Sequence, residues 1–472
     1  MTNIDKTTLR SELPFWRKLT FAAGMMGGSL MPMITIGWLL YYYTGRSTPA
    51  GDRIMLVSYS AFAVINIISR IVDAAAAPII GFASDRYNTR WGRRKPWVFF
   101  GSPFLTVCAV LLFYPPGSEG SFVNIVWLLA TLTGLWIFYT AVVAPYISLL
   151  PEITSCKKER IEISSYMGVF EVAGTLMATI AVGIFIKIFP EGIDAGFVNI
   201  SDGYKMAIIV FSIVALLFFW LSIIFVKEKP HSSAKEIPFG LIESIRQCLK
   251  NRPFVIFVIT LMLFSIALDE LIAMIPFMVT LIMGMGAHVG GYIQGAIVVA
   301  SLPMFFLVYH YSHRYGKKKV FGISFLMFGL ALPVMAFMND YPFIGWGINK
   351  LVVAAGGAPL KPGIISLVHS MVPMVLFVFP LASFFVLIRP IFADLIDLDE
   401  KYTGYRREAM YDGLMGLVIK IAAGIASVIG PLCLKFFGGT AEDPDGITVV
   451  FAICSVMLFA AYWLFRKYPI ED

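Results

Sequence analysis

The sequence predicts an all-α, polytopic membrane protein. Of its 472 residues, 58% are hydrophobic and only 14% are charged, and the mean hydropathy is +0.80. Soluble globular domains carry about 25% charged residues, so this composition is that of an integral membrane protein. The apolar segments are continuous and about 20 residues long, the length of helix that crosses the hydrocarbon core. The strands of a membrane barrel would instead alternate polar and apolar residues.

Twelve apolar segments follow one another along the chain, each bounded by charge, Gly or Pro. Their number and length predict twelve transmembrane helices. The N-terminal twenty residues are charged and have no small-residue cleavage site, so we expect the first span itself to direct membrane insertion. The predicted spans are 19–43, 56–83, 97–114, 123–150, 163–189, 204–226, 253–284, 288–312, 320–338, 368–396, 411–437 and 446–468.

Lys and Arg are distributed unevenly among the loops. If the N-terminus is cytoplasmic, both terminal tails and the cytoplasmic loops hold 27 of the 37 basic residues, and the outside loops hold 4. This bias predicts an inner or plasma membrane protein with both termini in the cytoplasm. It also accounts for the net charge of +7 without a nucleic-acid partner. The five Cys have no metal-like spacing, so we expect neither disulfides nor a metal site.

A short basic motif occurs once in each half of the chain. The sequence RWGRRK at 90–95 is repeated as RYGKKK at 314–319, an offset of 224 residues. The motif follows spans two and eight, which are equivalent positions in a six-plus-six arrangement. We therefore expect two pseudo-symmetric six-helix bundles. They comprise residues 1–226 and 253–472, joined by a cytoplasmic linker with an amphipathic helix at 227–252.

Three longer motifs resemble those of one transporter family. GFASDRYNTRWGRRKP at 81–96, APYISLLPEIT at 144–154 and FADLIDLDEKYTGYRREAMYDG at 392–413 resemble motifs of the glycoside-pentoside-hexuronide cation symporters. These relatives of melibiose permease are a branch of the major facilitator superfamily. The resemblance implies the major facilitator fold, with two bundles that rock about a midplane site between them. It also implies a monomeric transporter of a small-molecule solute in the lipid bilayer, not an enzyme, with no cofactor.

Several charged residues lie deep inside predicted spans. The helix rise places Asp73 about 16 Å and Lys420 about 14 Å from the cytoplasmic ends of their spans, near the middle of a core about 30 Å thick. Such a charge is costly unless it meets water or a partner, so each is a candidate for function. The alternatives are structural ion pairs, between Asp73 and Arg70 and between Lys420 and an acid of the other half. The same set of candidates includes Glu171, Asp269 and Glu270. Asp269 and Glu270 are adjacent, so their side chains point about 100° apart around the helix axis.

The resemblance assigns cation coupling to the second and fourth spans. That family carries two Asp four residues apart in span two, and this chain has Asp73 at the first position but Ala77 at the second. In span four it keeps Thr140 but has Val143 where the melibiose permease type has another Asp. One carboxylate is a poor Na⁺ site but can carry a proton, so we expect H⁺ rather than Na⁺ as the coupling cation at Asp73 and Thr140. Uncoupled facilitated diffusion is the alternative.

The expected solute site also departs from the melibiose permease type. Gly28, Ser29 and Met167 stand where that type has charged groups that bind galactosides, which argues against a galactoside. A sugar or glycoside is the favoured solute, and an amphipathic or lipid-like solute is the alternative. The remaining candidates for solute binding are Tyr139, Glu171, Asp269, Glu270, Phe385 and Lys420.

The cytoplasmic motifs suggest a gate. Asp85 ends its helix, where the helix dipole disfavours an anion, and it therefore needs a cationic partner. Gly81 would allow another helix to approach closely. The alternatives are that these bases only fix the topology or form a solvated loop. The candidate gating residues are Gly81, Asp85, Arg86, Arg93, Arg94, Arg406 and Arg407.

The outside loop at 339–366 is long and partly apolar. It is expected either to lie at the membrane interface or cap the cavity entrance, or to be a passive insertion.

Overall fold

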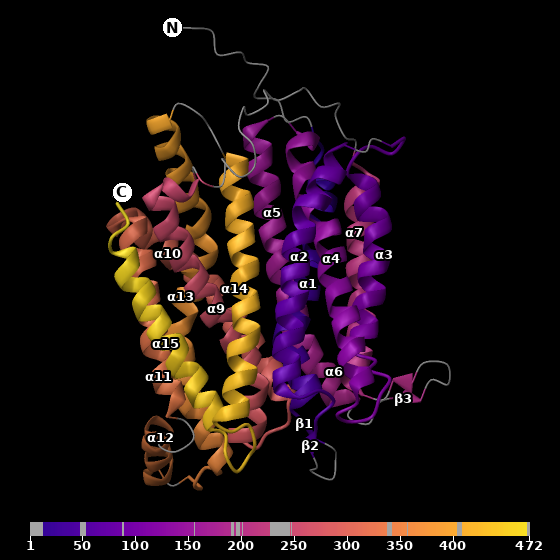
Figure 1. Cartoon of the computed structure of the whole chain (residues 1–472). Helices are drawn as coiled ribbons and strands as arrows, with labels where there is room; N and C mark the ends of the chain where they lie inside the picture. Colours follow the sequence, from indigo (N-terminus) through magenta and orange to yellow (C-terminus); the bar gives the residue numbers. More distant parts are fainter. Residues whose placement is uncertain are drawn as a thin grey trace. The chain divides into compact units, whose positions relative to one another are not determined.

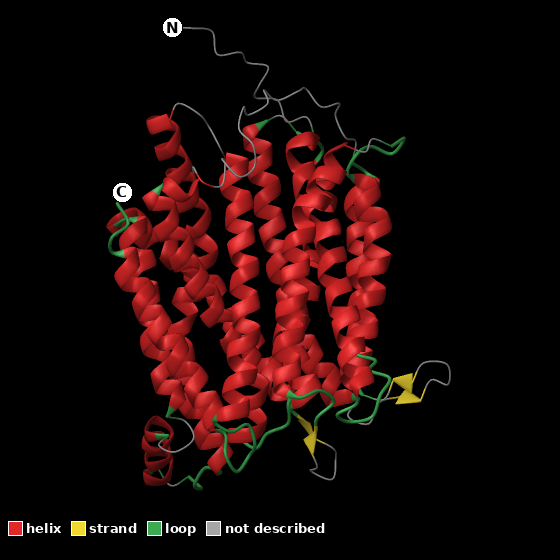
Figure 2. Cartoon of the chain, viewed as in Figure 1, coloured by secondary structure: helices red, strands yellow, loops and turns green. Residues whose placement is uncertain are grey.

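The computed structural model is built almost entirely of helices (Figures 1 and 2). Only four strands of two residues each occur in the described part of the chain: β1 (Arg46–Ser47), β2 (Arg53–Ile54), β3 (Ile193–Asp194) and β4 (Asn199–Ile200). They pair as β1 with β2 and β3 with β4. The structure describes residues 13–47, 53–86, 89–154, 156–189, 193–194, 199–200, 202–226, 246, 248–337, 342–355, 357–403 and 408–469. The predicted amphipathic helix in the linker falls almost wholly outside these residues.

Within this described part, twelve helices are long and apolar enough to cross a membrane, which confirms the predicted number of spans. Two of the spans contain a short π-helix, η2 (Met177–Ala181) between α5 and α6 and η3 (Met278–Ile282) after α9. The α-helices are α1 (Phe15–Thr44), α2 (Tyr59–Arg86), α3 (Lys95–Leu112), α4 (Phe122–Ile153), α5 (Lys157–Leu176), α6 (Val182–Ile188), α7 (Gly203–Ile224), α9 (Arg252–Phe277), α10 (His288–Tyr315), α11 (Lys317–Ala336), α12 (Phe343–Ala354), α13 (Pro362–Thr403), α14 (Glu408–Phe436) and α15 (Asp445–Phe465).

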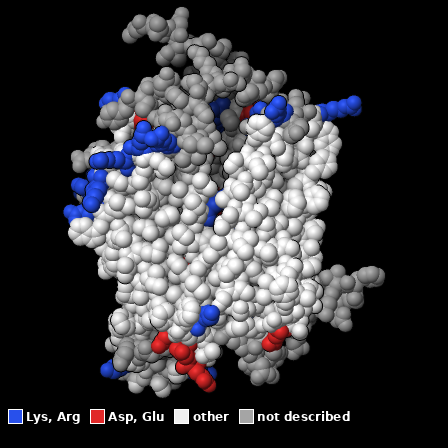
Figure 3. Space-filling view, viewed as in Figure 1, with Lys and Arg blue, Asp and Glu red and all other residues white. Residues whose placement is uncertain are grey.

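Charge is distributed as a membrane requires. In the view of Figure 3 the middle of the surface is almost free of Lys, Arg, Asp and Glu, and Lys and Arg gather toward one end. An uncharged band of this kind lets the apolar side chains face lipid tails without the cost of burying ions. The helix α13 is much longer than the roughly 20 residues that span the core, so its C-terminal turns carry acidic residues such as Asp394 out of the apolar band.

The chain forms two compact units, which are described separately. Unit 1 comprises Met1–Tyr42, Ile54–Val57 and Ile68–Glu236, and unit 2 comprises Tyr43–Arg53, Ser58–Ile67 and Ile237–Asp472.

In unit 1, α1 and α5 approach closely at Gly174. A Cβ atom at this glycine would lie 2.1 Å from Ser29 Oγ and 2.7 Å from the Met26 carbonyl oxygen, both on α1. The backbones can come this close only because the side chain is a hydrogen atom. The helix α1 also contacts α4, because the Tyr146 hydroxyl of α4 donates to the Phe21 carbonyl at 2.6 Å.

In unit 2, a proline in α9 leaves a backbone acceptor that α10 satisfies. Pro276 has no N–H, so the Ile272 carbonyl loses its helical donor. The buried Gln294 of α10 donates its Nε2 to that carbonyl at 3.1 Å. The backbone of α9 before Pro276 is therefore tied to a specific side chain of the next helix, which helps to fix how the two helices pack.

The long loop between α11 and α13 contains the helix α12 (Phe343–Ala354), which packs on the first part of α13. His369 of α13 is fully buried; its Nδ1 accepts from the Ile344 N–H at 3.3 Å, and its Nε2 lies 2.8 Å from the Val334 carbonyl. These two partners assign a neutral ring with the proton on Nε2. The Phe343 ring packs edge-on against the same imidazole, at 4.9 Å between centroids. The loop is therefore a docked element of unit 2.

We predict that Gly174→Ala lowers the apparent melting temperature of the purified protein. The added methyl group must push α1 and α5 apart, and overpacking of this kind costs about 1–3 kcal/mol. Gly168→Ala is the matched control, because it adds a methyl group to the same helix where no atom lies within 4 Å. Equal melting temperatures for both variants, measured by intrinsic fluorescence, would contradict the close approach of α1 and α5.

Candidate functional site

The predicted coupling residues Asp73 and Thr140 are in direct contact. Asp73 of α2 is 1% exposed, and its Oδ1 accepts a hydrogen bond from the Thr140 hydroxyl of α4 at 2.6 Å. One turn earlier on α2, the Ser69 hydroxyl lies 2.9 Å from that of Thr133, also on α4. Polar side chains therefore meet along the contact between these two helices, and the buried carboxylate receives a hydrogen bond that lowers the cost of its burial.

Arg70 and Tyr139 complete a polar cluster around this carboxylate. The Arg70 guanidinium lies over the Trp136 ring at 3.5 Å from the centroid, a close cation–π contact. The Tyr139 hydroxyl donates to the Gly28 carbonyl of α1 at 2.8 Å. Arg70, Asp73 and Glu171 all interact electrostatically with Tyr139. We call Arg70, Asp73, Trp136, Tyr139, Thr140 and Glu171 the unit 1 polar cluster.

Because residue 77 is Ala rather than Asp, α2 contributes a single carboxylate to the unit 1 polar cluster. Residue 77 lies one turn after Asp73 on α2 and is only partly buried. A second Asp at this position would face the same direction as the first. With Ala there and Val143 on α4, the charged groups of the cluster come from Arg70, Asp73 and Glu171, which include two acids and one base. The cluster therefore combines two carboxyl side chains with one cationic side chain.

In unit 2, the adjacent acids Asp269 and Glu270 occupy different environments. Glu270 is 2% exposed, and its Oε1 accepts from the Gly430 N–H of α14 at 3.0 Å. Its Oε2 has no hydrogen-bond partner among the described residues, and a Cβ atom at Gly430 would lie 2.7 Å from it. Asp269 is half-buried on another side of α9. Glu270 is thus packed into the contact between α9 and α14, and Asp269 is the more accessible of the two acids.

The other two solute candidates of unit 2 are partly accessible. Phe385 of α13 is 41% exposed and lies beside Phe305 of α10, with 6.3 Å between ring centroids. Lys420 of α14 is half-buried. An exposed aromatic face and a cation are the groups that stack on a sugar ring and bind its hydroxyl groups, but they are equally able to contact an amphipathic solute.

The basic motif before α3 is held by an acid that the sequence prediction missed. Arg93 Nη2 lies 2.5 Å from Glu152 Oε1, and Arg94 Nη1 lies 3.1 Å from the same oxygen. Arg94 also donates to the Ser148 carbonyl, one turn before Glu152 on α4. Glu152 stands in the quoted motif APYISLLPEIT, but nothing in the sequence shows which loop reaches the end of α4. We call Arg93, Arg94 and Glu152 the unit 1 clamp.

Unit 2 contains an equivalent clamp. Lys317 stands 224 residues after Arg93 in the repeated motif, and it forms an ion pair with Asp394 of α13. The glycine before each basic residue, Gly92 or Gly316, has a positive φ, of 111° and 88° respectively. Glycine adopts this conformation without strain. The repeat found in the sequence is therefore a repeat of backbone geometry and of a cation–carboxylate contact.

The outcome for the remaining gating candidates is mixed. No described atom lies within 4 Å of a Cβ atom built at Gly81, and the close approach of another helix to this residue stays a prediction. Arg86 is exposed and lies over the Phe82 ring, 5.6 Å from its centroid. The side chain of Asp85 and the residues Arg406 and Arg407 lie outside the described part of the chain.

A third charged network was also missed, and it joins the start of α1 to α5. Lys18 is 4% exposed, and its Nζ lies 3.3 Å from Glu159 Oε1 and 2.8 Å from Glu162 Oε2. Glu159 also accepts from the Thr154 hydroxyl at 2.5 Å and from the Leu13 N–H at 3.2 Å. Its members stand in charged segments that look like ordinary loop sequence, which is why their burial could not be foreseen.

Metal binding has no support in the described residues. They contain no group of three or more His, Cys, Asp or Glu that could hold a metal ion. The five cysteines are free thiols.

Comparison with known proteins identifies the family. Residues 20–472 match the family model described as MFS/sugar transport protein. The chain is 24% identical over 449 residues to an isoprimeverose transporter of Lactiplantibacillus pentosus, with 94% of this chain and 85% of that protein covered. It is 22% identical over 446 residues to sodium-dependent lysophosphatidylcholine symporter 1 of Xenopus tropicalis, with 87% and 80% covered.

The fold resembles the crystal structure of a D-xylose-proton symporter, with a TM-score of 0.62 at 14% identity over 96% of this chain and 97% of that one. This likeness supports the predicted major facilitator fold. Because the family match covers nearly the whole sequence, this chain belongs to the MFS/sugar transport protein family, and it is a multi-pass membrane protein whose relatives include symporters of sugars and glycosides.

Proposed function

We propose that this protein moves a sugar or glycoside across the plasma or inner membrane by alternating access, driven by a proton gradient through Asp73. The observation that carries the proposal is the buried Asp73 carboxylate, hydrogen-bonded by Thr140 and accompanied by Arg70 in the same cluster. Both termini are proposed to be cytoplasmic, from the distribution of Lys and Arg.

Proton rather than sodium coupling follows from the number of oxygen ligands near Asp73. Na⁺ must exchange its hydration shell for several protein oxygens, and two of the carboxylates that related symporters place here are replaced by Ala77 and Val143. A proton needs a single acceptor. When Asp73 takes up a proton, its charge disappears, and the Thr140 hydroxyl can remain as its partner because a hydroxyl group both donates and accepts.

Solute contacts are proposed for residues of both units. In unit 1 these are Tyr139 and Glu171, which belong to the same cluster as Asp73. This neighbourhood gives a simple route for coupling, because a change of charge at Asp73 alters the electrostatic environment of the groups that would bind the solute. In unit 2 we propose Asp269, Phe385 and Lys420, whereas Glu270 is better placed to stabilise the contact between α9 and α14.

An amphipathic solute is the second candidate. One relative is named a lysophosphatidylcholine symporter, and the charged groups that bind a galactoside in the melibiose permease type are replaced here by Gly28, Ser29 and Met167. These substitutions leave a less polar site that an acyl chain could occupy.

The function is tested by uptake into proteoliposomes that contain the purified protein. Radiolabelled isoprimeverose and lysophosphatidylcholine are the two probes, each under an imposed pH gradient, an imposed Na⁺ gradient or no gradient. We expect isoprimeverose to accumulate when the outside is acidic and not with Na⁺ alone. Accumulation driven only by Na⁺ would overturn the choice of ion, and transport of lysophosphatidylcholine alone would select the second candidate.

We predict that Asp73→Asn abolishes proton-driven accumulation but leaves counterflow exchange of the solute. The amide keeps the hydrogen bond with Thr140 and the shape of the site but cannot take up a proton. Thr133→Ala is the control, since it removes a hydroxyl from the same helix contact without touching the carboxylate. Accumulation by Asp73→Asn that equals wild type would exclude this residue as the coupling group.

The unit 1 clamp is proposed to hold the cytoplasmic end of this bundle. Glu152 is 11% exposed in its side chain and faces two guanidinium groups, so its removal leaves two poorly solvated cations close together. Losing one partner of a buried ion pair costs about 3–5 kcal/mol, and less where water reaches the pair as it does here.

We predict that Glu152→Gln accelerates alkylation of the half-buried Cys156, which follows the end of α4, by a membrane-impermeant maleimide. The clamp no longer fixes the end of α4, so the thiol is exposed more often. The rate is measured by peptide mass spectrometry. Glu119→Gln, an exposed carboxylate outside the clamp, serves as the control; an unchanged rate in Glu152→Gln would remove the clamp from the proposed gate.

A further inference from the structure

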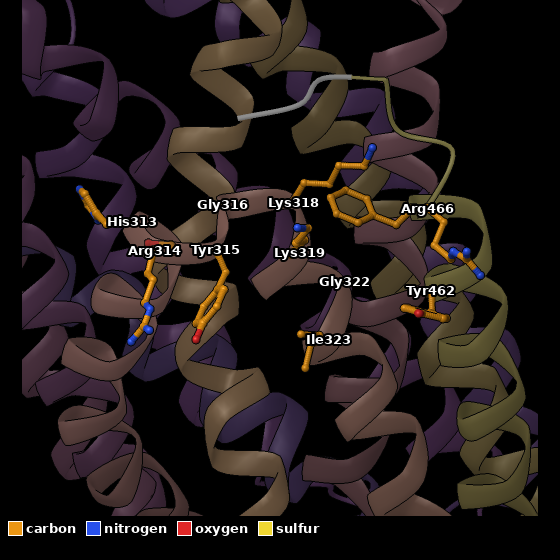
Figure 4. A pocket seen from close by; sticks show the side chains of 12 residues that line it. His313, Arg314, Tyr315, Gly316, Lys318, Lys319, Gly322, Ile323, Tyr462 and Arg466 are labelled. Atoms are coloured by element: carbon orange, nitrogen blue, oxygen red, sulfur yellow. The ribbon is translucent and has the colours of Figure 1, made fainter.

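Unit 2 contains a basic cavity that plays no part in the proposed transport cycle. It has a volume of about 750 Å³ and lies where the end of α10, the start of α11 and the end of α15 meet. Figure 4 shows Arg314, Lys318, Lys319 and Arg466 around it, together with Tyr315 and Tyr462. By the distribution of Lys and Arg, this end of the unit faces the cytoplasm.

The cavity concentrates positive charge. Arg314, Lys318, Lys319 and Arg466 line it, and no Asp or Glu among the described residues does. Lys317, by contrast, is turned to Asp394 in the unit 2 clamp. Arg314, Lys319 and Arg466 have no carboxylate partner within the described part of the chain; Arg314 and Arg466 instead lie 5.3 and 5.2 Å from the ring centroids of Tyr315 and Trp463. A cavity with this lining attracts an anion.

The cavity continues into an apolar surface. Ile323 lines it and is 48% exposed, and Leu330, seven residues later on the same face of α11, is 52% exposed. This stripe runs from the basic cavity along the helix into the apolar band. A ligand with a phosphate group and a long hydrocarbon chain would satisfy both parts at once, whereas a soluble anion would leave the stripe unused.

Two further features suit a headgroup at this depth. Tyr315 and Tyr462 belong to the aromatic residues that favour the boundary between headgroups and hydrocarbon. Gly316, with its φ of 88°, precedes the first turn of α11, so the backbone N–H groups of that turn lie beside the cavity. They can add hydrogen-bond donors to the charges of the side chains.

We propose that this cavity binds the phosphate headgroup of an anionic phospholipid from the cytoplasmic leaflet, with one acyl chain along Ile323 and Leu330. Arg314, Lys319 and Arg466 contact the phosphate group. Such a lipid would anchor the junction of α10 and α11, which contains the unit 2 clamp, and would link the behaviour of this end of the bundle to membrane composition.

The test measures lipid binding to the purified full-length protein. Nanodiscs of phosphatidylcholine receive increasing fractions of phosphatidylglycerol, and the melting temperature and the phosphatidylglycerol retained after detergent extraction are recorded. The variant carries Arg314→Gln, Lys319→Gln and Arg466→Gln. The matched control carries Lys250→Gln, Lys401→Gln and Lys467→Gln, three exposed cations of unit 2 that do not line the cavity.

We expect phosphatidylglycerol to stabilise the wild type and the control, and the cavity variant to retain at least about tenfold less of this lipid. Equal loss in both variants would indicate general attraction to an anionic surface and overturn the proposal. Equal stabilisation by inorganic phosphate or glycerol 3-phosphate in detergent, without lipid, would show that the ligand is a soluble anion and would overturn the lipid proposal. Arg314→Lys with Arg466→Lys keeps the charge and should keep binding, which excludes a folding defect as the cause of the loss.

Discussion

The structure depends on one constraint, that a buried polar group in an apolar helical bundle is costly unless it finds a partner within the protein. Asp73 receives the Thr140 hydroxyl, Gln294 supplies the donor that Pro276 cannot, and the Gly430 N–H meets Glu270. Because lipid offers no hydrogen bonds, each of these contacts fixes the position of one helix against another. The same constraint applies to the unit 1 polar cluster. Its carboxylate, guanidinium group and phenol are costly to bury, and apolar side chains would pack the bundle without that cost.

The two clamps show how a repeated sequence becomes a repeated structural element. In each unit, a glycine with positive φ turns the chain after a long helix, and the next basic residue pairs with an acid on a helix further along the unit. The pairs are partly exposed, so water weakens the attraction within each of them. In unit 2, Lys318 and Lys319 follow the clamp residue Lys317 and line the cavity instead. The same motif therefore supplies both the clamp and the proposed lipid site.

Much of the fold could be predicted because the membrane imposes simple rules on composition. The twelve spans followed from the length of the apolar runs, and the observed helix ends differ from the predicted ones by only a few residues in most cases. The tenth span was the exception: α13 continues to Thr403 because it leaves the apolar band and its polar end remains helical. The helix α12 could not be recognised as a docked element, since its contact with the buried His369 joins residues that the sequence separates by a loop.

The sequence by itself determined the family, the spans and the identity of the unusual buried charges, because hydrophobicity and local motifs are properties of short segments. The tertiary structure alone decided the partners. It showed that Asp73 pairs with Thr140, and that the basic motif pairs with Glu152 of α4 rather than with a residue of its own loop. The reason is physical: a side chain's partner depends on the rotation of each helix about its axis and on its contacts with neighbours, and these follow from the packing of all the helices together.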